Sequence, residues 1–192
     1  MNNKFFTLIR PYLGYIDSGK MFREPIGSVY IILAILNLVF PIYVLIKAIK
    51  NHIFQESTEI VSVFIVFWII LGLTGWISFQ LWWDRNEKIN KTSKEGDDFT
   101  AIPVYSHFIQ TLGEWFGTYI AIIGFFFGIG TAIVKKSDLI IGQSIPGASA
   151  LIGGGVAYGL LSLLAGYLII FLSRAAAEML RAVVSIANNT RK

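Results

Sequence analysis

The chain contains no cysteine and few charged side chains, and each of these shortages excludes some classes of protein. None of its 192 residues is cysteine, which excludes a disulfide framework, a thiolate metal site and lipid attachment through a cysteine thiol. Charged residues make up only 15% of the chain, whereas 55% of it is hydrophobic. A soluble domain of this length carries more charge. The composition therefore indicates a membrane protein.

Catalytic and cofactor motifs are also missing from the sequence. It has no His-Glu-x-x-His, no Walker loop and no Gly-x-Ser-x-Gly. Its two histidines, His52 and His107, fall on opposite sides of the membrane in the topology given below, which argues against a shared metal site. We therefore expect no catalytic residue, no metal site, no cofactor and no enzyme activity.

Long apolar stretches are what the chain does contain. Four of them, free of charged residues, cover residues 25–46, 60–83, 115–134 and 146–173. A bilayer core about 30 Å thick takes roughly 20 helical residues to cross, and a helix satisfies its own backbone hydrogen bonds in lipid. The sequence therefore predicts an all-α fold, a four-transmembrane-helix bundle that forms one membrane domain over residues 1–192.

The distribution of Lys and Arg predicts the orientation of this bundle. Twelve of the 16 basic residues lie before the first span, in the central loop over 84–103, or after the fourth span. The positive-inside rule therefore places both termini and this loop in the cytoplasm. Trp82, Trp83 and Trp115 fit an aromatic belt at that interface. The composition, rich in Ile, Asn and Lys, favours the inner (cytoplasmic) membrane of a bacterium as the location.

Amphipathic cytoplasmic segments are expected at both ends of the chain. From Phe5 to Ile16 apolar residues recur at helical spacing among basic ones, which is typical of a helix on the inner leaflet. Packing against the ends of the spans is the alternative, and Pro11 interrupts the pattern. The tail after the fourth span is expected to lie on the cytoplasmic face. Charges in the central loop nearly cancel, which favours a solvated linker and argues against binding of nucleic acid.

Glycine is concentrated in the second half of the chain, where residues 113–166 hold 12 of the 18. Small residues four apart on a helix form a flat strip that lets another backbone approach closely. Spans three and four are therefore predicted to be the tightly packed or oligomer-forming pair, with the strips acting within one subunit or between subunits. The strip residues are Gly113, Gly117, Gly124, Gly128, Gly155, Gly159, Ser162 and Gly166.

Three consecutive glycines, Gly153 to Gly155, stand near the start of the fourth span. Each weakens a helix by roughly 1 kcal/mol relative to alanine. A helix that opens here could line an ion or substrate path, and close approach of a neighbouring helix is the alternative that we favour.

Pro41 interrupts the hydrogen-bond ladder of the first span. It cannot donate to the carbonyl of Asn37, so that carbonyl and the Asn37 amide need partners at mid-membrane depth. Thr74 and Ser78 of the second span are the candidate partners. A structural role is favoured over a functional polar pocket.

The strongest polar cluster is expected at the cytoplasmic end of the third span. Its spacing places one set of polar residues on a single helical face, namely His107, Gln110, Thr111, Glu114 and Thr118. Charged residues at the ends of the second and fourth spans are expected nearby: Asp84, Arg85, Arg174, Glu178 and Arg181. A carboxylate at mid-depth costs about 2.5–3.5 kcal/mol on insertion scales, so it usually faces a partner or a water cavity. We predict that Glu114 contacts Arg174.

Two roles remain open for this cluster. It can be an ion-pair clamp that holds the spans in register, which we favour. It can also bind an ion or a proton, with Glu114 as the titrating group and His107 tuning it.

The tail of the chain carries the one resemblance to known proteins. From Arg174 to Thr190 the last span runs into an Arg, a Glu four residues later, an Ile and a closing Asn-Thr. This ending resembles that of small, uncharacterised bacterial membrane proteins. The resemblance implies that class and no particular activity.

Two functions from different classes fit these features. The first is a non-enzymatic membrane accessory subunit or self-assembling scaffold, which sits in the lipid bilayer and binds copies of itself or another membrane protein. The second is a small oligomeric ion channel or transporter, with a path near Glu114 and Gly153 to Gly155.

Overall fold

The computed structural model describes residues 9–89, 91, 101–134 and 155–190, and the elements in these ranges are helices. They are α1 (Arg10–Asp17), α2 (Lys20–Lys50), the 3-10 turn η2 (Ile53–Gln55), α3 (Thr58–Ile89), α4 (Ala101–Val134) and α7 (Val156–Thr190). Four of them, α2, α3, α4 and α7, are long and apolar enough to cross a membrane. The prediction of an all-helical chain with four such helices is thereby confirmed.

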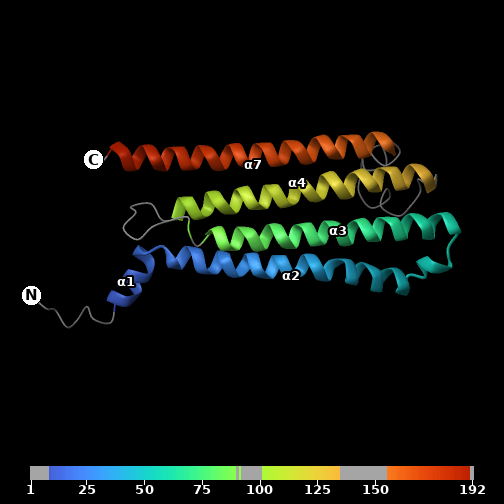
Figure 1. Cartoon of the computed structure of the whole chain (residues 1–192), viewed down its shortest axis with the longest axis horizontal. Coiled ribbons are helices and arrows are strands. Elements are labelled where there is room, and N and C mark those ends of the chain that lie inside the picture. Colours follow the sequence, from blue (N-terminus) through green and yellow to red (C-terminus); the bar gives the residue numbers. More distant parts are fainter. Residues whose placement is uncertain (1–8, 90, 92–100, 135–154, 191–192) are drawn as a thin grey trace, which may run out of the picture.

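The four long helices lie side by side along the longest dimension of the molecule (Figure 1). The most extensive contact joins α4 and α7, followed by those of α3 with α2 and with α4, whereas α2 and α4 touch only slightly. The starts of α2 and α4 and the ends of α3 and α7 lie together (Figure 1). We call this the terminal end of the molecule.

The helices at the terminal end extend beyond the apolar stretches. Helix α3 continues to Ile89 and α4 begins at Ala101, so the predicted loop over 84–103 is shorter than expected. Lys88 donates to Asp84 one turn earlier at 2.7 Å, a pairing that supports the helix. Pro103 falls in the first turn of α4, where its missing N–H has no intrahelical partner to lose.

Helix α7 is one unbroken helix of 35 residues. The tail that was predicted to lie on the cytoplasmic face instead continues the helix, because the chain has neither glycine nor proline between Tyr167 and Thr190 and its Ala-rich sequence favours helix. The described helix begins at Val156, after Gly155 in a turn with φ of 45°. The rest of the predicted start of the fourth span, including Gly153 and Gly154, lies outside the described residues.

Helix α1 confirms part of the predicted N-terminal helix, whose first residues lie outside the described ranges. Pro11 does not interrupt it, because it occupies the first turn. A left-handed Gly19, with φ of 71°, separates α1 from α2. Tyr15 donates to Glu24 at 2.8 Å, and this hydrogen bond to a carboxylate raises the pKa of the tyrosine.

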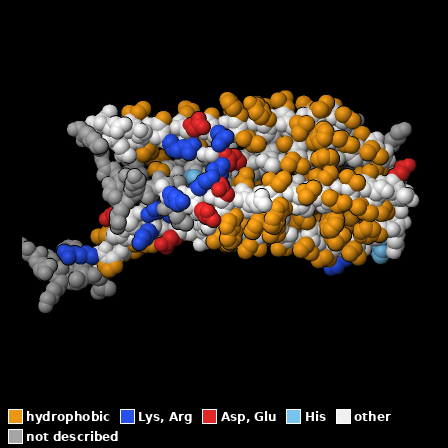
Figure 2. All heavy atoms as spheres, in the orientation of Figure 1, with side chains coloured by type: hydrophobic (Ala, Val, Ile, Leu, Met, Phe, Trp, Pro, Cys, Tyr) orange, Lys and Arg blue, Asp and Glu red, His pale blue; other side chains and the backbone are white. Residues whose placement is uncertain are grey.

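Most large apolar side chains point outward. The buried core is small and lies toward the terminal end, around Tyr30, Ala34, Trp82, Ile89 and Val104. Figure 2 shows hydrophobic side chains over most of the visible face, while Lys, Arg, Asp and Glu gather mainly toward the terminal end. An apolar surface of this extent fits a lipid bilayer around the helices.

Candidate functional site

Glycines bring α4 and α7 into backbone contact and set their register. A Cβ on Gly117 would lie 2.5 Å from the carbonyl oxygen of Gly166, and one on Gly128 would lie 2.5 Å from the amide nitrogen of Gly159. Real Cβ atoms do not approach other atoms so closely, so these positions need the absence of a side chain. Close to Glu114, Gly113 packs against Ser173, and this register brings Glu114 beside Arg174.

Glu114 is the centre of a polar network at this level. It is 7% exposed, and Arg85 of α3 donates to its Oε2 through Nε at 3.1 Å and through Nη2 at 2.7 Å. Its Oε1 accepts a hydrogen bond from Nε2 of Gln110 at 2.8 Å and lies 3.2 Å from Nε of Arg174. The predicted contact between Glu114 and Arg174 is confirmed, and Arg85 is its second ion-pair partner.

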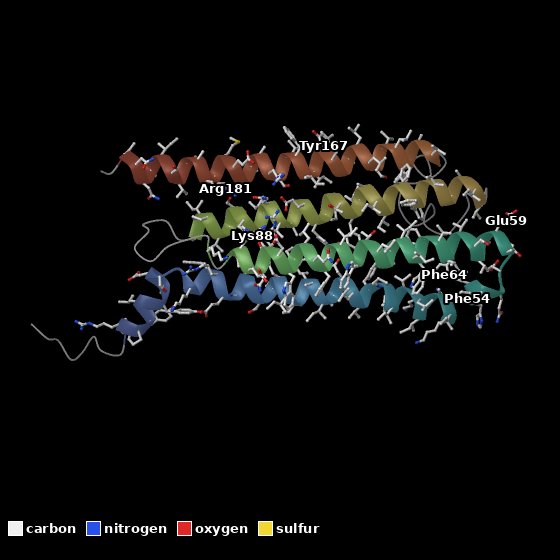
Figure 3. All side chains as sticks on the ribbon, viewed as in Figure 1. Phe54, Glu59, Phe64, Lys88, Tyr167 and Arg181 are labelled. Carbon is white, nitrogen blue, oxygen red and sulfur yellow. The ribbon has the colours of Figure 1, made fainter. Side chains whose placement is uncertain are left out.

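Gln110 extends this network to a second arginine of α7. Its Oε1 accepts a hydrogen bond from Nη2 of Arg181 at 2.9 Å, while its Nε2 donates to Glu114. The side chains of three helices are thus joined in one chain of charge-assisted bonds, which are stronger than neutral ones. In Figure 3, Lys88 of α3 and Arg181 of α7 lie toward the terminal end, where this network is built.

A second group of bonds ties α2 to the same face of α4. The hydroxyl of Tyr30 donates to Oγ1 of Thr111 at 3.3 Å and lies 3.1 Å from Nδ1 of His107. Thr111 in turn donates to the carbonyl of His107 at 2.8 Å. Tyr30 is fully buried and packs edge-on against Trp82, with ring centroids 5.0 Å apart. Thr118 donates to the carbonyl of Glu114 and so stays within its own helix.

Two residues predicted in this cluster lie outside the network. Asp84 is exposed and pairs with Lys88 on its own helix, because it stands about 100° around α3 from Arg85. Glu178 is exposed as well. The α4 groups near it bond elsewhere, since Ser106 donates to the carbonyl of Ala177 at 2.9 Å and Gln110 accepts from Arg181.

Indoles donate to two of the polar groups around Pro41, the Asn37 side-chain oxygen and the Pro41 carbonyl. Nε1 of Trp115 donates to Oδ1 of Asn37 at 3.0 Å, and Nε1 of Trp68 donates to the carbonyl of Pro41 at 3.0 Å. The Asn37 amide nitrogen donates to the carbonyl of Leu33 at 2.7 Å. The site therefore draws its donors from α3 and α4.

The predicted partners Thr74 and Ser78 are wrong. Thr74 donates to the carbonyl of Ile70 in its own helix at 2.8 Å, and Ser78 Oγ has no hydrogen-bond partner among the described residues. The reason is that α3 presents Gly75 to this part of α2. A Cβ there would lie 2.5 Å from the carbonyl oxygen of Asn37, so the two backbones meet directly and leave no room for a side chain between them.

The three tryptophans predicted to form an aromatic belt differ in their surroundings. Trp83 is 46% exposed, whereas Trp82 is fully buried and Trp115 donates to Asn37. Beside Trp115 a groove of about 620 Å³ opens between α2 and α4. Its lining is aliphatic and aromatic apart from Asn37, so it does not extend the polar network along the helices.

The site residues that sequence reasoning missed are Tyr30, Trp68 and the inward role of Trp115. Each is an aromatic residue in an apolar stretch, where the pattern indicates only a lipid-facing or interfacial side chain. Their polar atoms give no periodic signal. A search for aromatic donors near Asn37 and Pro41 could have found the two tryptophans.

The geometry defines the class of protein: an all-helical chain with four helices suited to cross a membrane, of which α3, α4 and α7 are joined by ion pairs to the buried Glu114. Among the residues that the structure describes, no group of three His, Asp or Glu could hold a metal ion. Comparison with family models, with curated proteins and with solved structures found no match to this chain. The resemblance of the tail therefore stays a prediction.

Proposed function

We propose that this protein is a non-enzymatic subunit of a membrane assembly, an accessory or scaffold protein that binds copies of itself or another membrane protein. It forms a four-helix bundle in the cytoplasmic membrane of a bacterium, and its terminal end faces the cytoplasm. The excess of Lys and Arg in the segments at that end supports this orientation.

The observation that carries the proposal is the saturation of Glu114. Its two oxygens take two bonds from Arg85, one from Gln110 and an ion pair with Arg174. A carboxylate held in this way by fixed donors from three helices serves as a clamp between them. Such a group is poorly suited to take up and release an ion.

The outward face of the molecule supports an assembly role as well. Helix α7 makes its main contact with α4, and its other side is covered with exposed Leu, Phe and Tyr side chains. Figure 3 shows Tyr167 on the side of α7 that faces away from α4. This side is open to lipid or to another transmembrane helix.

Native mass spectrometry of a tagged copy, extracted gently from its own membrane, tests the proposal. We expect a complex with a second protein or a closed homo-oligomer. A lone monomer under conditions that preserve known membrane complexes would overturn it.

A small oligomeric channel or transporter is the second candidate function. The observation in its favour is that two titratable groups, His107 and Glu114, are buried on one face of α4, two turns apart, at 8% and 7% exposure. Glu114→Gln in proteoliposomes separates the two functions. A changed pH dependence of ion flux favours transport, and a change in assembly or yield alone favours the subunit.

A further inference from the structure

The last part of α7 carries an exposed apolar stripe that begins beside the polar network and runs past it. Met179, Val183 and Ile186 are 70%, 62% and 63% exposed, and the stripe continues through exposed Ala176 to Leu172. Exposed apolar side chains are expected where lipid surrounds a helix. The stripe therefore needs another partner only where it lies outside the hydrocarbon core of the bilayer.

Arg174 marks the level where the hydrocarbon core ends. Arg174 is paired with the buried Glu114, and the 35 residues of α7 span about 52 Å at 1.5 Å per residue, well beyond a hydrocarbon core of about 30 Å. The residues after Arg174, which include Glu178 and Arg181, therefore project from the membrane. Met179, Val183 and Ile186 lie in this projecting part, where they need a cover other than acyl chains.

Helix α4 does not provide that cover. It packs on the opposite side of α7, where Ala177 and Val184 are buried and Arg181 donates to Gln110. In the described residues this α4 contact is by far the most extensive one that α7 makes. Among residues 9–89, 91, 101–134 and 155–190, which the structure describes, nothing covers the stripe.

The spacing of the stripe identifies the kind of partner. Leu172, Ala176, Met179, Val183 and Ile186 follow one another at steps of four, three, four and three residues. This is the heptad period of two helices that wrap around each other. The positions that flank the stripe, which decide partner choice in such pairs, carry no charge: Ala175, Leu180, Ala182 and Ala187.

We propose that the partner is a second copy of this chain, paired through the projecting end of α7 as a parallel two-stranded coiled coil. Copies in one membrane share one orientation, so identical stripes meet in register, residue against like residue, about a two-fold axis along the membrane normal. Uncharged flanks suit this pairing because like helices then meet without repulsion. The inference rests on the proposed assembly role and names its partner and its surface.

The absence of cysteine makes the test direct. Single substitutions Met179→Cys and Ile186→Cys place thiols on the stripe, and Ser185→Cys places one at the same level on an exposed position off it. After mild oxidation of intact membranes that contain the full chain, we expect a disulfide-linked dimer for Met179→Cys and for Ile186→Cys. We expect no such dimer for Ser185→Cys. Adding Val183→Asp to Met179→Cys should abolish the cross-link, because it buries a carboxylate against its own copy.

The outcomes separate this inference from the proposed function. Equal cross-linking at all three positions indicates random collision, and no cross-linking at any of them excludes the pairing, so either result overturns the inference. Cross-linking of Met179→Cys to a different protein overturns it as well but keeps the assembly role. A monomer in native mass spectrometry, together with no cross-link, overturns both.

Discussion

Arg85 of α3 directs two nitrogens at one oxygen of Glu114 on α4, with Nε at 3.1 Å and Nη2 at 2.7 Å from Oε2. The other oxygen is thereby left for Gln110 and Arg174. This division lets a single carboxylate join α3 to α7 across α4.

Removal of this carboxylate should destabilise the protein strongly. Glu114→Ala leaves Arg85, whose side chain is only 20% exposed, without its counter-charge, and breaking a buried pair in this way typically costs about 3 kcal/mol or more. Thermal unfolding in detergent measures the loss. Asp84→Asn is the matched control, because its pair with Lys88 is half-exposed and contributes at most about 1 kcal/mol. Equal shifts in Tm for the two variants would contradict the clamp.

An added methyl group at the contact between α4 and α7 should destabilise the protein. Gly117→Ala places a Cβ against the carbonyl of Gly166, and we expect a loss of about 1–3 kcal/mol in the free energy of unfolding. Gly72→Ala in α3 meets nothing within 4 Å and should be neutral or stabilising by up to about 1 kcal/mol. Urea or heat unfolding of both variants in the same detergent decides the matter. If Gly117→Ala is as stable as Gly72→Ala, the contact between α4 and α7 is not close-packed.

The indole that satisfies Asn37 should be worth about one hydrogen bond. Trp115→Phe keeps the aromatic packing but removes the donor to Asn37, with an expected loss of about 1 kcal/mol. Trp76→Phe, at a side chain that is 51% exposed, serves as the control and should leave the Tm unchanged. If the two substitutions change the Tm equally, the hydrogen bond between Trp115 and Asn37 does not contribute to stability.

The ring of His107 should carry its proton on Nδ1. Thr111 donates to a backbone carbonyl and accepts from Tyr30, so the Tyr30 oxygen is left to accept from Nδ1 of His107 at 3.1 Å. Nitrogen-15 NMR of labelled His107 reads the tautomer, and Tyr30→Phe should change it or raise its heterogeneity. Tyr43→Phe, on an exposed side chain, should not. A wild-type ring protonated only on Nε2 would contradict this assignment.

Accessibility of single thiols should report the orientation. Ser57→Cys, between η2 and α3, and Ser185→Cys, near the end of α7, lie toward opposite ends of the molecule. A membrane-impermeant maleimide added to intact cells should label the first and reach the second only after lysis. The reverse pattern would invert the proposed topology.

The sequence predicts the four long helices because their apolar stretches exceed what any soluble helix needs. It also predicts the meeting of Glu114 with Arg174, since a carboxylate at the edge of an apolar stretch needs a cation. Periodicity shows which residues share a face of a helix, but it does not show how that face is turned toward a neighbouring helix or how far a side chain extends. For that reason the sequence does not predict that Arg85 rather than Asp84 contacts Glu114, or that the indole of Trp68 donates to Pro41.

The boundaries of the helices were less predictable for a different reason. Hydropathy marks where lipid ends, whereas a helix ends where its backbone loses support. In α7 no glycine or proline follows Tyr167, so the helix continues through charged residues to Thr190. The apolar stretch and the helix therefore differ in length, and hydrophobicity predicts only the length of the apolar stretch.

The dependence of α7 on α4 also bears on how the chain is made. A ribosome completes α2, α3 and α4 before α7, and these three already have contacts with one another. Before α7 is made, Gly117 and Gly128 of α4 have no helix packed against them, and Glu114 has bonds only from Arg85 and Gln110. We therefore expect α7 to dock onto α4 after α2, α3 and α4 have been made, and Arg174 to pair with Glu114 in that step.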